Sequence, residues 1–367
     1  MFANNEKISE RQLTRLMVLD WTGKFCLLLP VLFSVVQGVE EMAALVLAVA
    51  GTFFYTGILG YIAKNMGSSF TIYLQERFGV ILARSTGLLF FAYLLLNQIY
   101  LTRAVGRVST VFLLPESSEE IIGILFLLAG WITARGSVQK RARTAEVLFP
   151  VLAALLIIML IASAKSVQWA NLKTLNVQDA DGENVICEAA VLFAAFSGMA
   201  VMLYQVPHLR KKGSLRRALK KSVVITGIFQ IALFIVMLGA FGKNDLSQLE
   251  WPVLVLMSNV NIPGGFLQRW DIIFLSALLF SFLSASGMGI YYMGKILSEV
   301  FHGKKEESLQ IYCVVISVAV VLIVRNYEYA EQLFARWALC AFLPLVAALP
   351  VMLAVLERGL RCKKQKK

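Results

Sequence analysis

The sequence predicts an all-α polytopic membrane protein that crosses the bilayer ten times, and composition, hydropathy and the recurrence of apolar runs support this fold class. Hydrophobic residues make up 58% of the 367 residues and charged residues 16%, whereas soluble domains have about 45–50% and about 25%. The mean hydropathy is +0.72. Apolar runs close to the roughly 20 residues of one crossing recur along the whole chain. This composition excludes a soluble enzyme, a disordered chain and a secreted disulfide scaffold.

The apolar runs define ten predicted helices in a single transmembrane domain that covers residues 1–367. Their boundaries are about 13–37, 42–63, 86–113, 120–134, 145–164, 185–207, 222–241, 270–298, 309–325 and 333–356. The fourth run is short, but a basic loop follows it directly. A crossing at 120–134 therefore keeps the basic loops on one side of the membrane.

Lysine and arginine are distributed unequally between the two sides that these helices define. With the N-terminus inside, the cytoplasmic segments carry 26 of the 35 Lys and Arg residues and the outer loops carry 6. Cationic loops resist translocation, so both termini are expected in the cytoplasm. The net charge of +12 is interpreted as this orientation signal. The basic loop 208–221 lies between two crossings, which favours the same interpretation over a nucleic-acid site.

Residue types that carry catalytic or metal chemistry form no recognisable motif in this sequence. The five cysteines, an odd number without a CxxC spacing, predict neither a disulfide framework nor a metal site. The two histidines have no partner at ligand spacing. The sequence has no catalytic dyad or nucleotide-binding loop, and the outer loops 165–184 and 242–269 are too short to be domains. It therefore predicts no enzyme and no cofactor.

Two of the predicted helices contain helix-weakening residues near their middle. The first has Thr22-Gly23 within DWTGKFCLLLP, and the sixth has Ser197-Gly198 within LFAAFSGMAVMLYQVP. Glycine has low helix propensity, and an interrupted helix at membrane depth is tolerated where it lines a cavity. Interruptions at matching places in two inverted halves indicate the central site of a transporter. We therefore expect helices 1 and 6 to be interrupted, within inverted five-helix repeats over about 13–164 and 185–325.

The first of these segments also carries charge. Asp20 and Lys24 are spaced i and i+4, which suits an ion pair on one helix face. A charged group at the bilayer centre costs about 2.5–3.5 kcal/mol by insertion scales. Two interpretations stay open: a structural pair that fastens helix 1 to its neighbours, or a fixed cation, Lys24, in a binding cavity. In the second case Lys24 replaces a coupling ion or attracts a carboxylate.

Arg103 and Arg107 lie one turn apart in the outer part of the third predicted helix. Long basic side chains near a helix end extend toward the headgroups. We expect both to reach the outer headgroups or the acidic residues Glu116, Glu119 and Glu120 rather than to bind a ligand.

Several segments point to a known family. They run over nearly the whole chain, from KISERQL and TGKFCLLLP through LFAAFSGM to LRRALKKS. The most specific is LEWPVLVLMSNVNIPGGFLQRWDIIFL at 249–275, with an aromatic–proline pair, an Ile-x-Gly-Gly-Phe turn and an Arg-x-Asp entry to the eighth helix. Together they resemble the spore germination permeases, the membrane-embedded B subunits of nutrient germinant receptors within the amino acid–polyamine–organocation transporter superfamily. Two positions depart from the pattern, Lys24 for a small residue and Ala200 for an acidic one, and both alter the charge expected in the pocket.

The resemblance implies a LeuT-like fold with a ligand pocket between helices 1 and 6 and with helices 3 and 8 as the opposing wall. It also implies A-type and lipoprotein C-type partner subunits in the inner membrane of a bacterial spore. The signal would be a small nutrient, typically an amino acid, and the output would be germination. Taken with the two interruptions, it predicts a nutrient site formed by Thr22, Gly23, Lys24, Phe196, Ser197, Gly198 and Met199.

The sequence leaves three functions open. The first is the receptor subunit, in which backbone amides freed at the two interruptions, together with Lys24, bind a carboxylate. The second is a stand-alone proton-coupled amino acid transporter, in which a buried Lys24 gains and loses a proton. The third is a non-transporting assembly platform, in which the glycines serve only for helix packing.

Overall fold

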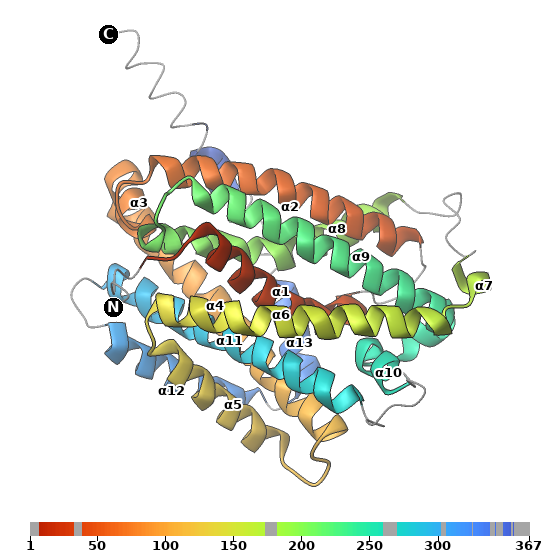
Figure 1. Cartoon of the computed structure of the whole chain (residues 1–367). Helices are drawn as coiled ribbons and strands as arrows, with labels where there is room; N and C mark the ends of the chain where they lie inside the picture. Colours follow the sequence, from red (N-terminus) through yellow and green to blue (C-terminus); the bar gives the residue numbers. More distant parts are fainter. Residues whose placement is uncertain are drawn as a thin grey trace.

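The computed structural model describes residues 7–32, 39–172, 182–259, 270–301, 306–324, 326–337, 342, 348–353 and 355. These ranges fold almost entirely into helices (Figure 1). In chain order the elements are α1 (Glu10–Leu32), α2 (Val39–Asn65), α3 (Phe70–Phe78), α4 (Val80–Phe112), α5 (Glu119–Ala134), α6 (Val138–Ser163), the 3-10 helix η1 (Ala164–Ser166), α7 (Trp169–Leu172), α8 (Gly182–Ser197), the 3-10 helix η3 (Gly198–His208), α9 (Ser214–Gln248), α10 (Pro252–Ser258), α11 (Trp270–Val300), α12 (Glu306–Ile323) and α13 (Tyr327–Trp337).

Six helices in the described ranges are long and apolar enough to cross a membrane: α2, α4, α6, α9, α11 and α12. They overlap the second, third, fifth, seventh, eighth and ninth predicted crossings, and the protein is an all-helical integral membrane protein. The other four predicted crossings are less regular. α1 carries Asp20 and Lys24, α5 has 16 residues, and the sixth apolar run is divided between α8 and η3. Much of the predicted 333–356 helix lies outside the described residues, as do parts of 165–184 and of 249–275.

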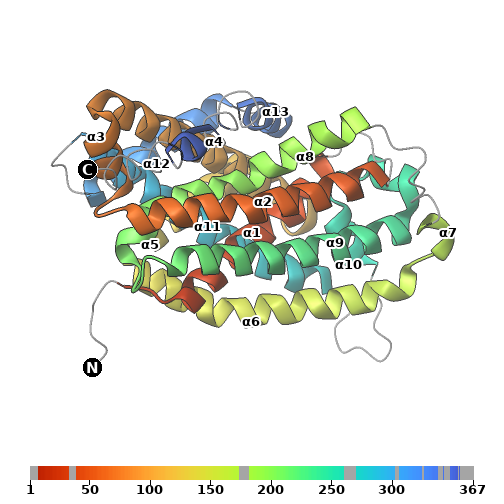
Figure 2. The ribbon, with the colours of Figure 1, turned by 90° about the horizontal axis from the view of Figure 1, so that it is seen from above.

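α1 occupies the interior of the bundle, where it packs on α6, α9 and α11. α2, α8 and α9 form one side of the molecule in Figure 1, and α4, α5, α11 and α12 form the other. Figure 2 shows α6 along one edge and α13 along the opposite edge. The arrangement places α1 where it contacts both halves of the chain.

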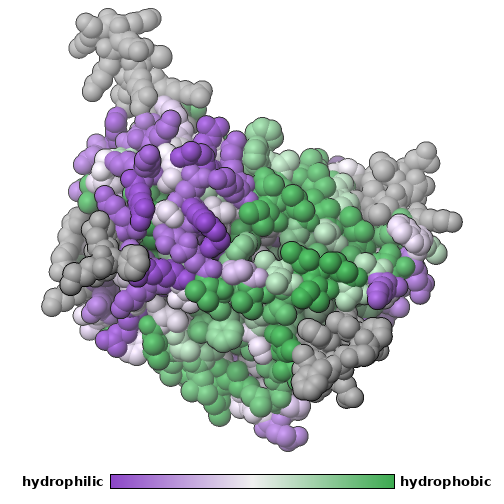
Figure 3. Space-filling view, viewed as in Figure 1, coloured by the Kyte–Doolittle hydropathy of each residue, from purple (hydrophilic) through white to green (hydrophobic). Residues whose placement is uncertain are grey.

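Hydrophilic and hydrophobic side chains separate along the bundle. Figure 3 shows hydrophilic side chains gathered at the end near α3 and hydrophobic ones over the face on which α6 and α9 lie. At the hydrophilic end, the Ile8 N–H donates to the His208 carbonyl (2.8 Å) and the Arg210 N–H donates to the Ile8 carbonyl (3.2 Å). The segment before α1 is thereby held against the segment after η3.

α1 is a single α-helix through Thr22, Gly23 and Lys24, so the predicted interruption of helix 1 at this place is wrong. The glycine serves packing instead. A Cβ at Gly23 would overlap the Ser281 hydroxyl of α11, and that hydroxyl donates a hydrogen bond to the Leu19 carbonyl of α1. Small residues allow membrane helices to approach closely in this way. Glycine therefore brings α1 and α11 together without breaking the helix.

The second predicted interruption, at Ser197-Gly198, is present as a change of helix type. α8 ends at Ser197, and the 3-10 helix η3 runs for 11 residues from Gly198. Runs of 3-10 helix longer than about 3–4 residues are uncommon and often mark a hinge or strain. A Cβ at Gly198 would lie 2.6 Å from the Tyr93 hydroxyl of α4, so this glycine also permits a close approach.

The two arginines of the third predicted helix have different surroundings. Arg107 is partly exposed and pairs with Glu119 (3.0 Å), one of the expected partners. Arg103 is 2% exposed, donates to the Val321 carbonyl of α12 and pairs with Glu120 (3.5 Å), which is also one of the expected partners. Arg103 is therefore a structural link between α4 and α12.

Candidate functional site

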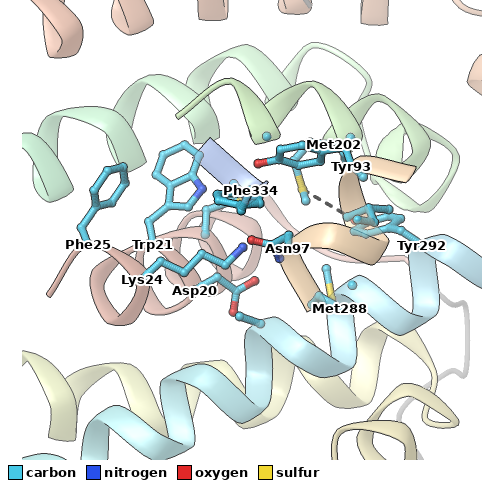
Figure 4. Close-up of a pocket in the computed structure, with 16 residues that line it drawn as sticks. Asp20, Trp21, Lys24, Phe25, Tyr93, Asn97, Met202, Met288, Tyr292 and Phe334 are labelled. Atoms are coloured by element: carbon cyan, nitrogen blue, oxygen red, sulfur yellow. Dashed lines mark hydrogen bonds between the residues drawn. The ribbon is translucent and has the colours of Figure 1, made fainter. Parts of the chain in front are cut away.

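A small internal cavity lies where α1, α4, η3, α11 and α13 meet (Figure 4). Its volume is about 60 Å³, room for a few water molecules. The residues that line it are Met17, Asp20, Trp21, Lys24, Phe25, Tyr93, Leu94, Asn97, Gly198, Val201, Met202, Ala285, Met288, Gly289, Tyr292 and Phe334. The cavity therefore joins the charged part of α1 to the α8–η3 junction, the two segments that the sequence indicated.

Two residues of the predicted nutrient site, Lys24 and Gly198, border this cavity, and so does Asp20 of the predicted charge pair. Asp20 and Lys24 contribute side chains from α1, and Gly198 borders the cavity at the start of η3. Phe196 lies one layer behind, where its ring centroid is 4.4 Å from that of Phe25. Its ring packs against Trp21 and Phe25, two aromatic residues of the cavity lining.

The other predicted residues do not border the cavity. Thr22 is buried on another face of α1, where it lines a separate crevice between α6 and α9. Gly23 faces Ser281, and Met199 is fully buried in the core. The side chain of Ser197 lies outside the described residues. Since α1 is unbroken, its amides at 22–24 are hydrogen-bonded within the helix, and only the Lys24 side chain is available to a ligand.

The two charged groups of the cavity have different surroundings. Asp20 is 6% exposed, and its Oδ1 accepts a hydrogen bond from Ser284 of α11 (2.8 Å). Lys24 extends past Asp20 toward Asn97 of α4 (Figure 4). Among the described residues no direct ion pair joins Asp20 to Lys24. The charge pair therefore stays a prediction, although both groups border the same space.

The sequence did not single out the contribution of α4. Tyr93 and Asn97 of α4 border the cavity opposite α1. The family resemblance implied that the third helix forms part of this wall, but it named none of the residues of that helix. Asn97 stands in the apolar run LLLNQIY, and polar residues within a crossing commonly mark function. That signal could have found Asn97. No comparable signal distinguishes Tyr93 from the many aromatic residues of the chain.

Aromatic and polar contacts surround the cavity. Phe334 of α13 borders it and stacks on Tyr100 of α4 (5.4 Å between centroids), which also contacts the Tyr327 ring (5.9 Å). On the η3 side, the Tyr292 hydroxyl donates to Gln205 (2.7 Å). The volume of about 60 Å³ holds a few water molecules, so a larger ligand requires side chains of the lining to move.

The cavity carries groups of both charges on otherwise mostly apolar walls. Within the described ranges, no group of three His, Cys, Asp or Glu side chains is placed to hold a metal ion. The polar groups around the cavity are one ammonium, one carboxylate, the Asn97 amide and the Tyr93 and Tyr292 hydroxyls, and the rest of the lining is aromatic, aliphatic, glycine or thioether. Such a set can bind both ends of a small zwitterion.

Comparison with protein families places this chain among germination proteins. The family model described as "Spore germination protein" matches residues 7–330. The chain is 26% identical over 240 residues to Spore germination protein A2 of Bacillus subtilis (strain 168), with 65% of each chain aligned. It is 22% identical over 255 residues to Spore germination protein B2 of the same organism, with 68% of this chain and 67% of the relative aligned. The chain thus spans about two thirds of the length of these relatives.

Solved structures of transporters have a similar fold. MhsT in complex with L-phenylalanine superposes with a TM-score of 0.69 at 16% identity, over 91% of this chain and 87% of MhsT. Mhp1, a nucleobase-cation-symport-1 family transporter, superposes with a TM-score of 0.66 at 12% identity, over 93% of this chain and 77% of Mhp1. At these identities the similarity establishes the fold, which is that of the LeuT-fold transporters.

Proposed function

This chain belongs to the spore germination permease family, and we propose that it senses a small amino acid, bound in the cavity between α1 and η3, as the membrane subunit of a nutrient germinant receptor. The family consists of germination receptors with a transporter-like fold and not of enzymes. The observation that carries the proposal is the placement of Lys24 and Asp20 on one cavity with otherwise largely apolar walls.

The charged groups suit the two ends of an amino acid. The Lys24 ammonium attracts the ligand carboxylate, and the Asp20 carboxylate and the Asn97 carbonyl accept hydrogen bonds from the ligand ammonium. Ionisable groups within a membrane are costly and face cavities or one another, and here both border the same cavity. The aromatic and thioether walls, which include Trp21 and Met202, favour a small apolar side chain. The related fold of MhsT holds L-phenylalanine, which supports this ligand class.

Ligand binding shifts the protein between two arrangements. The cavity of about 60 Å³ is narrower than a bound amino acid requires, so the ligand stabilises a wider form. The 11-residue 3-10 helix η3, which begins beside the cavity at Gly198, is the element suited to move. Partner subunits of the A type and the lipoprotein C type respond to this change of conformation and trigger germination.

Replacing Lys24 tests the proposal. Spores of a deletion strain are complemented with the wild-type chain, Lys24→Met or the control Lys64→Met, which changes an exposed lysine at the end of α2. Each of the twenty L-amino acids is then titrated against germination. We expect Lys24→Met to abolish the germination response or to raise the half-saturating amino acid concentration at least tenfold. The amount of the variant protein in spore membranes should stay normal. Unchanged dose–response curves at normal protein levels would overturn the role of Lys24.

The topology that accompanies this function has ten crossings in two inverted repeats, with both termini in the cytoplasm. The concentration of lysine and arginine on one predicted side supports it. Single cysteines in a cysteine-free chain test it, with Glu183→Cys for the outer side and Lys140→Cys for the inner side. A membrane-impermeant maleimide should label only Glu183→Cys in intact cells, and the reverse labelling would contradict the orientation.

A second candidate is a stand-alone proton-coupled amino acid transporter. The observation that favours it is the presence of two titratable groups, Asp20 and Lys24, on one cavity at membrane depth. Proteoliposomes that contain only this chain would then accumulate labelled amino acid under a pH gradient. Binding without uptake in the same vesicles would favour the receptor.

A further inference from the structure

A second, larger cavity lies on the outside of α1, between α6 and α9. Its volume is about 290 Å³, and its lining is apolar except for Thr22. Val18 and Thr22 of α1 form its floor, and side chains of α6 and α9 form its two walls. The lining extends from Phe149 to Leu160, which is about 17 Å of helix. The cavity is therefore a long furrow, called the α6–α9 furrow below.

The α6–α9 furrow faces the bilayer. Both helices are long and apolar enough to cross a membrane. Ile157 of one wall is 56% exposed and Ile228 of the other is 65% exposed. Figure 3 shows hydrophobic side chains over this face of the molecule. An apolar furrow at this depth is in contact with hydrocarbon rather than water.

Basic residues continue the α9 wall at one end of the furrow. Arg217, Lys221 and the lining residue Ile225 are spaced by four and therefore share one face of α9. Both basic side chains are exposed and reach Glu10 at the start of α1, at 3.0 Å and 2.6 Å.

A third cation lies at the same end. The Arg15 guanidinium is 5.8 Å from the centre of the Phe149 ring, which lines the furrow. Arg15 also pairs with Glu146 of α6 at 3.8 Å. Arg15, Arg217 and Lys221 thus face two carboxylates, Glu10 and Glu146, and this end of the furrow keeps a net positive charge.

We propose that the α6–α9 furrow binds one acyl chain of an anionic phospholipid, with the lipid phosphate near Arg15, Arg217 and Lys221. The furrow is long and almost entirely apolar, which suits a single hydrocarbon chain. The positive end complements an anionic headgroup at the membrane surface. Charge and shape therefore point to the same ligand.

Lipid in the furrow contacts the helix that also lines the ligand cavity. With 3.6 residues per turn, Val18 and Thr22 lie on the face of α1 opposite Asp20 and Lys24. The acyl chain therefore packs against the face of α1 that points away from the ligand cavity. The proposed lipid site does not depend on whether the cavity on the other face of α1 binds an amino acid.

Photo-cross-linking tests the proposal on the full-length protein in nanodiscs. The probe is phosphatidylglycerol with a diazirine in the middle of one acyl chain, and adducts are mapped by mass spectrometry. The variants Ala153→Phe and Ala232→Phe fill the furrow from opposite walls. The matched control is Ala154→Phe, because Ala154 is the exposed neighbour on α6. We expect adducts on the α1 peptide with Val18 and Thr22 in wild type and control, and several-fold fewer in both furrow variants.

The headgroup is tested in the same nanodiscs. The double variant Arg217→Gln/Lys221→Gln should lose the excess of α1 adducts from phosphatidylglycerol over a phosphatidylcholine probe. Lys211→Gln, which removes an exposed lysine in the preceding loop, should keep it. An equal yield from both probes in wild type would overturn the anionic headgroup.

Three results would overturn the acyl-chain site. The first is the absence of α1 adducts in wild type, with adducts only on exposed rim residues. The second is an equal yield in Ala153→Phe and Ala154→Phe. The third is the loss of α1 adducts when the receptor partner subunits are present, which would identify a partner helix as the occupant.

Discussion

The Ser284 hydroxyl of α11 donates a 2.8 Å hydrogen bond to the carboxylate of Asp20 on α1. This bond joins two helices beside the cavity that Lys24 also borders. A carboxylate buried at membrane depth is costly unless it is hydrogen-bonded or paired. Ser284 therefore fixes the position of Asp20, which in the proposed site accepts hydrogen bonds from the ligand ammonium.

Removing this hydroxyl should weaken ligand sensing. A hydrogen bond to a charged group contributes about 1.5–3 kcal/mol, so Ser284→Ala should raise the half-saturating amino acid concentration about tenfold or more. The control is Ser276→Ala, because the Ser276 hydroxyl donates to the Ile272 carbonyl of its own helix, α11 (2.7 Å). Germination titrations at matched protein levels provide the measurement. Equal curves for the two variants would show that Asp20 does not need Ser284.

The close approach of α1 and α11 depends on Gly23. Gly23→Ala would overlap the Ser281 hydroxyl, and overpacking of this kind costs about 1–3 kcal/mol. We expect a lower thermal unfolding temperature in detergent, partly restored by adding Ser281→Ala. Gly67→Ala is the control, because a Cβ there meets nothing within 4 Å. If Gly23→Ala and Gly67→Ala unfold at the same temperature, the packing role assigned to Gly23 is wrong.

A substitution at Gly198 distinguishes the receptor hypothesis from the assembly-platform hypothesis. A Cβ at this position lies 2.6 Å from the Tyr93 hydroxyl, at the edge of the cavity. Gly198→Ala should therefore reduce the germination response while the A-type and C-type subunits still co-purify. Adding Tyr93→Phe removes the oxygen and should restore part of the response. Loss of co-purification with an unchanged half-saturating concentration would favour the platform instead.

The two arginines of α4 should differ in their effect on stability. Arg103 is buried and donates to the Val321 carbonyl, so Arg103→Met should lower the free energy of unfolding by about 1.5–3 kcal/mol. Arg107 pairs with Glu119 at the surface, and exposed pairs contribute about 0–1 kcal/mol. Arg107→Met should therefore change the unfolding temperature little. Calorimetry of both variants in the same detergent compares them, and a larger effect of Arg107→Met would refute this assignment.

The all-helical membrane fold, the family and two of the segments that border the cavity could be predicted from the amino-acid sequence alone. Burial of about 20 apolar residues in hydrocarbon is a local property, so runs such as 42–63 and 222–241 predicted helices that the structure contains. Asp20 and Lys24 could be identified as candidate site residues in the same way, because a charged residue within an apolar run is also a local property of the sequence.

The packing of the helices against one another sets which side chains share the cavity and what Gly23 and Gly198 do. Thr22 and Lys24 are two residues apart, yet helical rotation places Thr22 in the α6–α9 furrow and Lys24 in the cavity. The sequence around Gly23 is the same whether this glycine interrupts a helix or allows another helix to pack closely. Only the position of Ser281, 258 residues further along the chain, shows that Gly23 allows close packing. Contacts between distant helices depend on the packing of the whole bundle, which no local pattern of residues specifies.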